Sequence, residues 1–206
     1  MPAFNLENRS TRTISDFKAR LVGGGARPNL FEVEMTDLPA GIAWDSTEFS
    51  FLCKAASLPA SVITPVEIPF RGRILKVAGD RTFETWSTTV INDENFLIRN
   101  AFETWMQGIS KNSNATGSTD PGSYMTYALV HQLGRGADKG ASSTTSSDAL
   151  SGTTLTPLKT YTFFDIFPTN ISAIDLSYEN TDAIEEYTVE FQVQYWEPGA
   201  YTKDNA

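Results

Sequence analysis

Residues 185–196 read EEYTVEFQVQYW, and their alternation sets the fold class of the chain. Every second residue is apolar and aromatic or β-branched: Tyr187, Val189, Phe191, Val193 and Tyr195. Glutamate, glutamine and threonine stand between them. A period of two predicts a β-strand with one face in a core and the other in water.

Weaker forms of this pattern recur upstream and predict a mainly β chain. Further strands are expected at residues 29–37, 46–54, 62–79, 81–91, 124–133, 156–167 and 174–178, with turns at 168–170 and 179–182. In the strand 46–54, Phe49, Phe51 and Cys53 would point into the core. Pro65 and Pro69 interrupt the segment 62–79, which therefore bends or lies at a sheet edge, because proline cannot donate to a β-ladder.

One helix is predicted over residues 93–108. The polar triplet Asn92-Asp93-Glu94 supplies a cap and an acidic first turn, and Gly108 is placed to end the helix. Its apolar residues recur at helical spacing on one face: Leu97, Ile98, Ala101, Phe102, Trp105 and Ile109. Strands and one amphipathic helix together predict an antiparallel β-sandwich or barrel with the helix packed on it.

The sequence predicts a single domain at residues 29–199, with an arm before it and a tail after it. Residues 1–28 form an arm with a short helical apolar cluster (Ile14, Phe17, Leu21) and a glycine-rich joint at Gly23-Gly24-Gly25. Residues 134–154 are rich in Gly, Ser and Thr and predict a long mobile loop. Residues 200–206 form a C-terminal tail.

Length, charge and composition limit the function classes. The 206 residues fit one domain of about 150–200 residues. Sixteen Lys and Arg against 25 Asp and Glu give a net charge of −9, which argues against a protein that binds nucleic acid through its phosphates. With one cysteine and no long apolar run, we expect a soluble protein made in a reducing compartment and not exported by a signal peptide.

No residue set predicts catalysis, a metal site or a cofactor. His131 is the single histidine, and Cys53 lies among apolar neighbours, where a thiol packs as a small hydrophobic side chain. Pairs such as Glu32/Glu34 and Glu186/Glu190 fit solvated strand faces better than an acid–base pair. We therefore expect a protein that is not an enzyme and uses no cofactor.

Four segments together resemble the tail tube protein of contractile-tailed bacteriophages of the large myovirus type. They are ARPNLFEVEM (26–35), FLCKAASLPAS (51–61), KVAGDRTFETWSTTVINDENFLIRNAFETW (76–105) and FPTNISAIDLSYENTDAIEEYTVEFQVQYWEPG (167–199). The resemblance runs from about residue 15 to about residue 199. It departs at residues 37–46, a segment longer than expected for the family, and at residues 134–154, which resemble an insertion at a hairpin tip.

The resemblance implies a subunit that closes into six-membered rings, stacked as a tube inside a contractile sheath. Each subunit would give a four-stranded sheet to a 24-stranded inner barrel and place its helix outside. Strands 46–54, 62–77, 124–133 and 156–167 would make that inner sheet, and strands 29–37, 82–91, 174–178 and 185–196 a second one. Implied partners are the sheath, baseplate or initiator, terminator and tape-measure proteins, with no membrane insertion. Viral DNA would transit the bore of this virion component, which is assembled in the host cytoplasm.

Two residue sets follow from this reading. Polar residues on the inner sheet are expected to line the lumen: Glu48, Ser50, Lys54, Glu67, Arg71, Arg73, Thr126, Gln132, Thr160 and Thr162. Residues 55–80 are expected to reach into a neighbouring subunit or ring, because prolines and mixed charges suit an interlocking extension. The residues expected at contacts between subunits lie in this segment or directly after it: Pro59, Pro65, Pro69, Lys76, Asp80 and Arg81.

Three alternatives stay open at the level of the sequence. A related contractile injection device would use the same tube to carry protein instead of DNA. A β-sandwich binding module would recognise a glycan or protein through residues 134–154, although this segment lacks Trp, Tyr and arginine-rich anchors. A hydrolase with surface carboxylates lacks any sign of a pocket.

Overall fold

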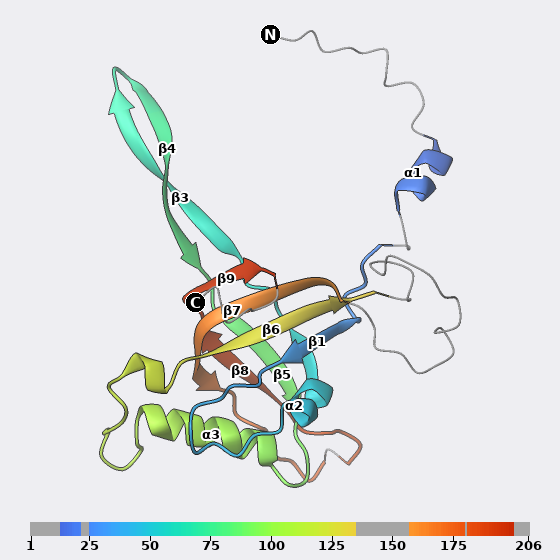
Figure 1. Cartoon of the computed structure of the whole chain (residues 1–206), viewed down its shortest axis with the longest axis vertical. Helices are drawn as coiled ribbons and strands as arrows, with labels where there is room; N and C mark the ends of the chain where they lie inside the picture. The colour runs from blue at the N-terminus through green and yellow to red at the C-terminus, as the bar shows by residue number, and fades with distance from the viewer. Residues whose placement is uncertain (1–12, 22–24, 135–156, 180, 200–206) are drawn as a thin grey trace. The chain divides into compact units, whose positions relative to one another are not determined.

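A computed structural model describes residues 13–21, 25–134, 157–179 and 181–199 of the chain (Figure 1). The elements in chain order are α1 Ile14–Arg20, β1 Phe31–Glu34, α2 Ser46–Leu52, β2 Cys53–Ala56, β3 Ser61–Phe70, β4 Arg73–Phe83, β5 Trp86–Ile91, α3 Leu97–Ile109, the short 3-10 helix Pro121–Ser123, β6 Thr126–Leu133, β7 Pro157–Ile171, β8 Glu186–Gln192 and β9 Tyr195–Pro198. The chain divides into a smaller unit, residues 1–31 with 132–158, and a larger unit, residues 32–131 with 159–206. The expected mainly β, antiparallel architecture is confirmed.

In the smaller unit the predicted helical cluster of the arm is confirmed as α1. A capping box starts this helix, in which the Thr13 hydroxyl accepts from the Asp16 N–H and the Asp16 carboxylate accepts from the Thr13 N–H. Its apolar side chains are exposed, with Phe17 at 62%. Gly23, Gly24 and most of the predicted loop 134–154 lie outside the described residues. The proposed boundaries of arm, joint and loop therefore stay predictions.

The larger unit is built on a sheet with the strand order β1-β6-β7-β8-β5-β2, and β9 also pairs with β7. Residues 161–164 of β7 pair with β9, whereas residues 167–171 pair with β8. Between these stretches Asp165 has a φ of 52°, a left-handed conformation that short polar side chains tolerate better than bulky ones. Strand β7 thus turns at Asp165 and joins the two halves of the sheet.

The core lies between α3 and the strands β5 and β8. Phe102 of α3 packs edge-on against Phe191 of β8 with ring centroids 5.7 Å apart, and Trp86 of β5 stacks on Phe163 of β7 at 5.0 Å. The indole N–H of Trp105 donates to the Tyr124 carbonyl at 2.8 Å. Each of the two ring pairs adds about 0.5–1.5 kcal/mol of stabilisation beyond the gain from the area it buries. The predicted apolar face of the helix is therefore confirmed as the inner one.

Helix α3 starts four residues later than the predicted residue 93, and the acidic first turn expected there is wrong, because Asp93 and Glu94 precede the helix. Helix α3 begins at Leu97, and the carboxylate of Asp93 accepts from the Leu97 N–H at 3.1 Å. The helix ends at Ile109, one residue after Gly108. Phe96, and not a residue of the predicted triplet, occupies the N-cap position and offers no side-chain cap, but Asp93 still satisfies a free backbone donor of the first turn.

The strand predicted at 46–54 is wrong, because residues 46–52 form helix α2. Asp45 caps it, since its carboxylate accepts from the N–H groups of Thr47 and Glu48 at 2.9 and 3.1 Å. At helical spacing Phe49 is fully buried, whereas Phe51 is 83% exposed. Cys53 is buried as predicted, but it belongs to the short strand β2. Apolar residues at alternate positions fit a strand, but the cap at Asp45 favours the helix that is observed.

The single extended strand predicted at 62–79 is also wrong, because the chain reverses in its middle. Strands β3 and β4 form a two-stranded antiparallel sheet, here called the hairpin, which turns at Arg71-Gly72 (Figure 1). Both turn residues have positive φ, 47° and 81°, which is the type I′ geometry that matches the twist of two strands. Pro65 and Pro69 lie in β3, so their expected edge position is confirmed, because each strand of a two-stranded sheet has a free edge.

Three smaller expectations also differ from the structure. Residues 174–178 are not a strand, and residues 168–170 lie within β7 at a bulge instead of forming a turn. The strand predicted at 185–196 is divided into β8 and β9, so that Val193 is buried while Tyr195 is 37% exposed. The predicted division into two four-stranded sheets is therefore wrong: β6 and β7 pair as expected, but the hairpin is separate and β2 pairs with β5.

Candidate assembly surfaces

The two residues considered for chemistry, Cys53 and His131, are held in the fold by burial and by hydrogen bonds. Burial raises the pKa of the Cys53 thiol to about 12, so this side chain is a protonated core residue at neutral pH. His131 lies 2.9 Å from the Thr160 hydroxyl through Nδ1 and 3.4 Å from Glu34 through Nε2. Within the described residues, no group of three or more His, Cys, Asp and Glu is arranged to hold a metal ion. None of the helices described there has the length and apolarity needed to cross a membrane.

One surface of the larger unit stands out because it is apolar and exposed. Residues directly opposite each other in antiparallel strands share a face. Val66 faces Val77 and Ile68 faces Leu75, so these pairs form one face of the hairpin, here called the apolar face. Its apolar members are Val62, Val66, Ile68, Phe70, Leu75 and Val77, each at least 40% exposed. The other face carries the ion pair between Lys76 and Glu67, at 3.0 Å.

The base of the hairpin is held by a close backbone approach at Gly79. The pairing register shifts between Ile63 and Pro65, so that β4 contributes an extra residue opposite β3. A Cβ on Gly79 would lie 2.4 Å from the Thr64 carbonyl oxygen. Only glycine fits at such a bulge without moving the backbone. The glycine at position 79 is therefore required by the close approach of the two strands.

The tip of the hairpin carries two cations without an acidic partner in the part of the chain that the structure describes. Arg71 occupies the turn and its guanidinium lies over the Phe70 ring, 5.3 Å from the centroid. Arg73 begins β4 opposite Phe70. The segment from Ile68 to Leu75 contains no carboxylate. The tip is therefore cationic and apolar at once.

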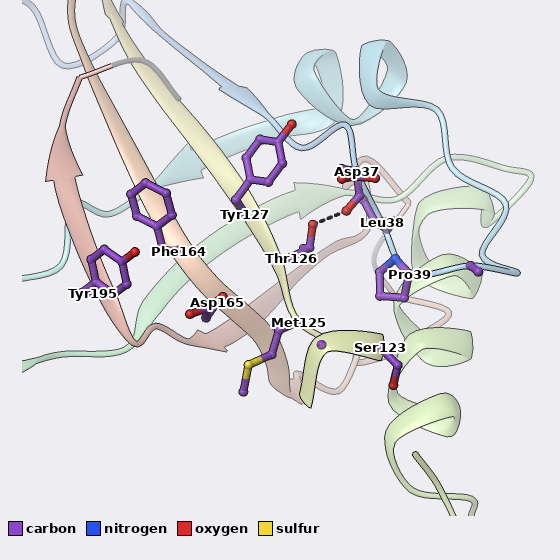
Figure 2. Close-up of a pocket in the computed structure, with 12 residues that line it drawn as sticks. Asp37, Leu38, Pro39, Ser123, Met125, Thr126, Tyr127, Phe164, Asp165 and Tyr195 are labelled. Carbon is purple, nitrogen blue, oxygen red and sulfur yellow. Dashed lines mark hydrogen bonds between the residues drawn. The ribbon is translucent and has the colours of Figure 1, made fainter. Parts of the chain in front are cut away.

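A groove of about 750 Å³ lies elsewhere on the larger unit (Figure 2). Phe164 of β7 and Tyr195 of β9 stack on one side of it with ring centroids 4.7 Å apart, and Asp37 and Leu38 lie on the other side. The described residues that line it are Asp37, Leu38, Pro39, Ala40, Gly122, Ser123, Met125, Thr126, Tyr127, Phe164, Asp165 and Tyr195. It includes two carboxylates and no cation, so the groove is acidic and aromatic.

The structure divides the residues predicted to line a lumen. Thr126 and Thr162 are buried, and their hydroxyls donate to the carbonyls of Asp37 and Gly199, so their expected exposure to a lumen is wrong. Glu48 and Ser50 lie on α2 and not on a strand. The alternation rule therefore fails for these four residues, because two take part in internal contacts and two belong to a helix.

The other members of that set lie in several places. Lys54 of β2 pairs with Glu186 of β8 at 2.5 Å, and Thr160 binds His131. In the smaller unit the Gln132 amide donates to the carbonyls of Arg27 and Leu30 at 2.7 and 2.6 Å. Glu67, Arg71 and Arg73 belong to the hairpin. The set is therefore not one surface of the subunit.

The residues predicted at inter-subunit contacts cluster much better. Pro65, Pro69, Lys76, Asp80 and Arg81 all belong to the hairpin, whereas Pro59 is buried just before it. Within the described residues, neither Asp80 nor Arg81 forms an ion pair. Prolines and mixed charge therefore selected residues of one structural unit, the hairpin, and its role in contacts between subunits stays a prediction. The apolar face of the hairpin was not predicted.

The acidic groove was also missed, because its lining comes from segments far apart in sequence. Asp37, Met125 and Asp165 become neighbours only when the sheet has formed. The one local signal was the Asp120-Pro121-Gly122 turn, in which the Asp120 carboxylate accepts from the Gly122 N–H. Such a turn predicts a loop but no groove.

Comparison with known proteins agrees with this architecture. The chain matches the family described as phage tail tube protein over residues 26–198. It is 31% identical to the tail tube protein gp19 of Enterobacteria phage T4 over 175 residues, 85% of this chain and 93% of that protein. It is 24% identical to the tail tube protein of Serratia phage KSP90, over 87% of this chain and 93% of that one.

Solved structures with the same fold come from contractile injection systems. One is a chain of the anti-feeding prophage baseplate, with a TM-score of 0.58, 12% identity, and coverage of 85% of this chain and 95% of that one. Another is a chain of an extracellular contractile injection system in its sheath-tube complex, with a TM-score of 0.52, 12% identity, and coverage of 93% and 100%. The family model spans most of the chain, and the resemblance noted in the sequence is thereby confirmed. The chain belongs to the phage tail tube protein family.

Proposed function

We propose that this tail tube subunit closes into six-membered rings, which stack into a hollow tube that conducts viral DNA inside a contractile sheath. The observation that carries the proposal is the hairpin Ser61–Phe83, whose apolar face has no covering element within the described residues. Burying a Val, Leu, Ile or Phe side chain gains about 1.5–3 kcal/mol. Six such residues on one face therefore favour association strongly.

Open strand edges support the same proposal. Strands β1 and β2 end the main sheet and are four residues each, and both strands of the hairpin have a free edge. Unpaired backbone groups at an edge tend to pair with another chain. A closed ring pairs such edges with defined partners, so it satisfies them without uncontrolled aggregation.

The charge of the chain supports a conduit. Each copy carries −9, so a ring of copies repels a transiting phosphate backbone instead of holding it. Lys54 is neutralised by Glu186 and Lys76 by Glu67, which removes two cations from those available to DNA. Of the predicted lumen set, Lys54, Glu67, Gln132 and Thr160 remain our candidates for the bore.

The proposed partners are the sheath, baseplate or initiator, terminator and tape-measure proteins, and the assembled tube is a virion component built in the host cytoplasm. The solved structures that share this fold come from assemblies described as a baseplate, a sheath/tube terminator and a sheath-tube complex. Those assemblies also favour a second candidate, a tube of an injection device that carries protein. Nucleic acid inside purified particles would separate the two.

Self-assembly is the direct test. The purified chain is followed by sedimentation over a concentration series and by electron microscopy, alone and with sheath and baseplate proteins. We expect six-fold rings and tubes whose abundance rises with concentration. A protein that remains monomeric at high micromolar concentration, with and without those partners, contradicts the proposal.

A further inference from the structure

We propose that the tip of the hairpin of one subunit docks in the acidic groove of a second copy of this chain. This inference rests on the proposed tube function and names the site that receives the hairpin. The tip consists of Phe70, Arg71, Gly72, Arg73 and Ile74. The groove is the space between the Phe164–Tyr195 stack and the Asp37 loop (Figure 2).

Charge complementarity identifies the occupant. The tip carries two guanidinium groups and no carboxylate, and neither arginine forms an ion pair within the described residues. Among the described residues, the groove is lined by Asp37 and Asp165 and by no cation. A tip with charge +2 therefore meets a groove with charge −2, and neither side has an ion-pair partner within that part of the chain.

The apolar parts match as well. Phe70 is 65% exposed beside Arg71, and the groove lining includes Leu38 and Met125. Arginine forms bidentate hydrogen bonds with carboxylates such as Asp37 and Asp165. A volume of about 750 Å³ is within the range of about 300–1,000 Å³ that holds a drug-sized ligand, and it is enough for a few side chains.

The contact joins two different surfaces, so it is heterologous. Such a contact generates a closed ring or an open stack of subunits, whereas a contact between identical patches ends at a dimer. A tip-in-groove contact therefore explains how one chain forms an assembly without a fixed length. It gives Arg71 and Arg73 a protein partner, which differs from the lumen position predicted from the sequence.

Compensating charge reversal tests the pairing. Arg73→Glu places a like charge beside the groove, and Asp37→Arg places one beside the tip, so each is expected to lower tube yield by about tenfold or more. The double variant restores opposite charges and is expected to recover most of the yield. Lys111→Glu, in an exposed loop, changes the net charge by the same amount as Arg73→Glu, so it is the matched control for that variant and is expected to assemble normally.

The outcomes separate the two proposals. Normal tubes from both single variants, or no recovery in the double variant, overturn the tip-in-groove contact and leave the tube function standing. Failure of the wild-type chain to assemble at all overturns the tube function, and this inference with it.

Cross-linking gives a second readout that does not depend on yield. A chain with both Arg73→Cys and Asp37→Cys is assembled and then oxidised. We expect a ladder of covalent multimers, because each copy would be linked to two others. Each chain with only one of the two introduced cysteines is expected to stay monomeric on a denaturing gel, because Cys53, its other cysteine, is buried. Assembled tubes of the double-cysteine chain that yield no covalent dimer contradict the contact.

Discussion

The core under α3 and the hairpin are built from the same kinds of residue and are used in opposite ways. Phe102 of α3 is fully buried among aromatic rings, whereas Phe70 of the hairpin is 65% exposed. Both regions are rich in β-branched and aromatic side chains. The difference shows that apolar residues in the core stabilise the subunit, while those of the hairpin are available to stabilise an assembly. Stability and assembly should therefore respond to separate substitutions.

The largest expected effect is on the core side. Phe102→Ala removes a ring that contacts Trp44, Phe49, Trp105 and Phe191. We expect a loss of about 3–5 kcal/mol in the free energy of unfolding, measured by denaturant titration. The matched change Phe70→Ala on the hairpin should cost less than about 0.5 kcal/mol, because the side chain is exposed in the free subunit. Equal losses at the two sites would remove the distinction between the regions.

The hairpin side should show the reverse pattern. The pair of changes Ile68→Thr and Leu75→Thr keeps residues compatible with strands but makes the centre of the apolar face polar. We expect a folded subunit whose stability changes by less than about 1 kcal/mol and whose tube formation, followed by sedimentation, falls at least about tenfold. Both substitutions lie on the hairpin and leave β5 and the rest of the main sheet unchanged. The free energy of unfolding of the subunit is therefore the reference against which the loss of assembly is read. Normal assembly would show that the apolar face is not an interface.

Thiol reactivity compares the two regions in one molecule. Cys53 is 6% exposed, so in the folded chain it should react with a thiol reagent only after unfolding. A cysteine introduced by Val66→Cys on the apolar face should react at once in the free subunit and become protected in tubes. Labelling followed by mass spectrometry distinguishes the sites. Undiminished labelling of the hairpin position in tubes would argue against burial of this face.

The last comparison concerns alkaline pH. Burial raises the pKa of Cys53 to about 12, so the folded chain keeps a proton that the unfolded chain releases near pH 9. The folded state therefore loses stability as pH rises from about 9 to 12. Burial also raises the pKa of Tyr187, which adds to the same trend. Cys53→Ala should reduce the slope of unfolding free energy against pH in this window, and an unchanged slope would contradict a buried neutral thiol.

The regions also differ in how far the sequence predicts them. The apolar face of helix α3 and the parts of the predicted strands 81–91 and 185–196 that form β5 and β8 were predictable, because their periodic patterns agree with the tertiary packing. The pattern at 46–54 is short and fits both periods, so the cap at Asp45 decided against the strand. The hairpin lacks an Asn-Gly or Asp-Gly signal and turns at Arg71-Gly72 instead. Alternation in sequence shows which residues share a face, but not whether that face is covered.

The groove could not have been predicted from any local pattern. Asp165 lines it because β7 bends there, and Asp37 lines it because the loop after β1 passes beside β6. Neither bend is encoded by periodicity. Charge complementarity between the tip and the groove becomes visible only when segments more than 30 residues apart in sequence are brought together.

The most direct measurement is electron microscopy of a chain with a shortened hairpin, beside the wild-type chain. Residues 64–80 are replaced by Asn-Gly, so that the opposed pair Ile63 and Arg81 flanks a two-residue turn. The account predicts tubes from the wild-type chain. From the variant it predicts a folded subunit, with a thermal midpoint within about 4–8 °C of the wild type, that forms no tubes. Tubes of normal length from the shortened chain would contradict the claim that the hairpin holds the assembly together.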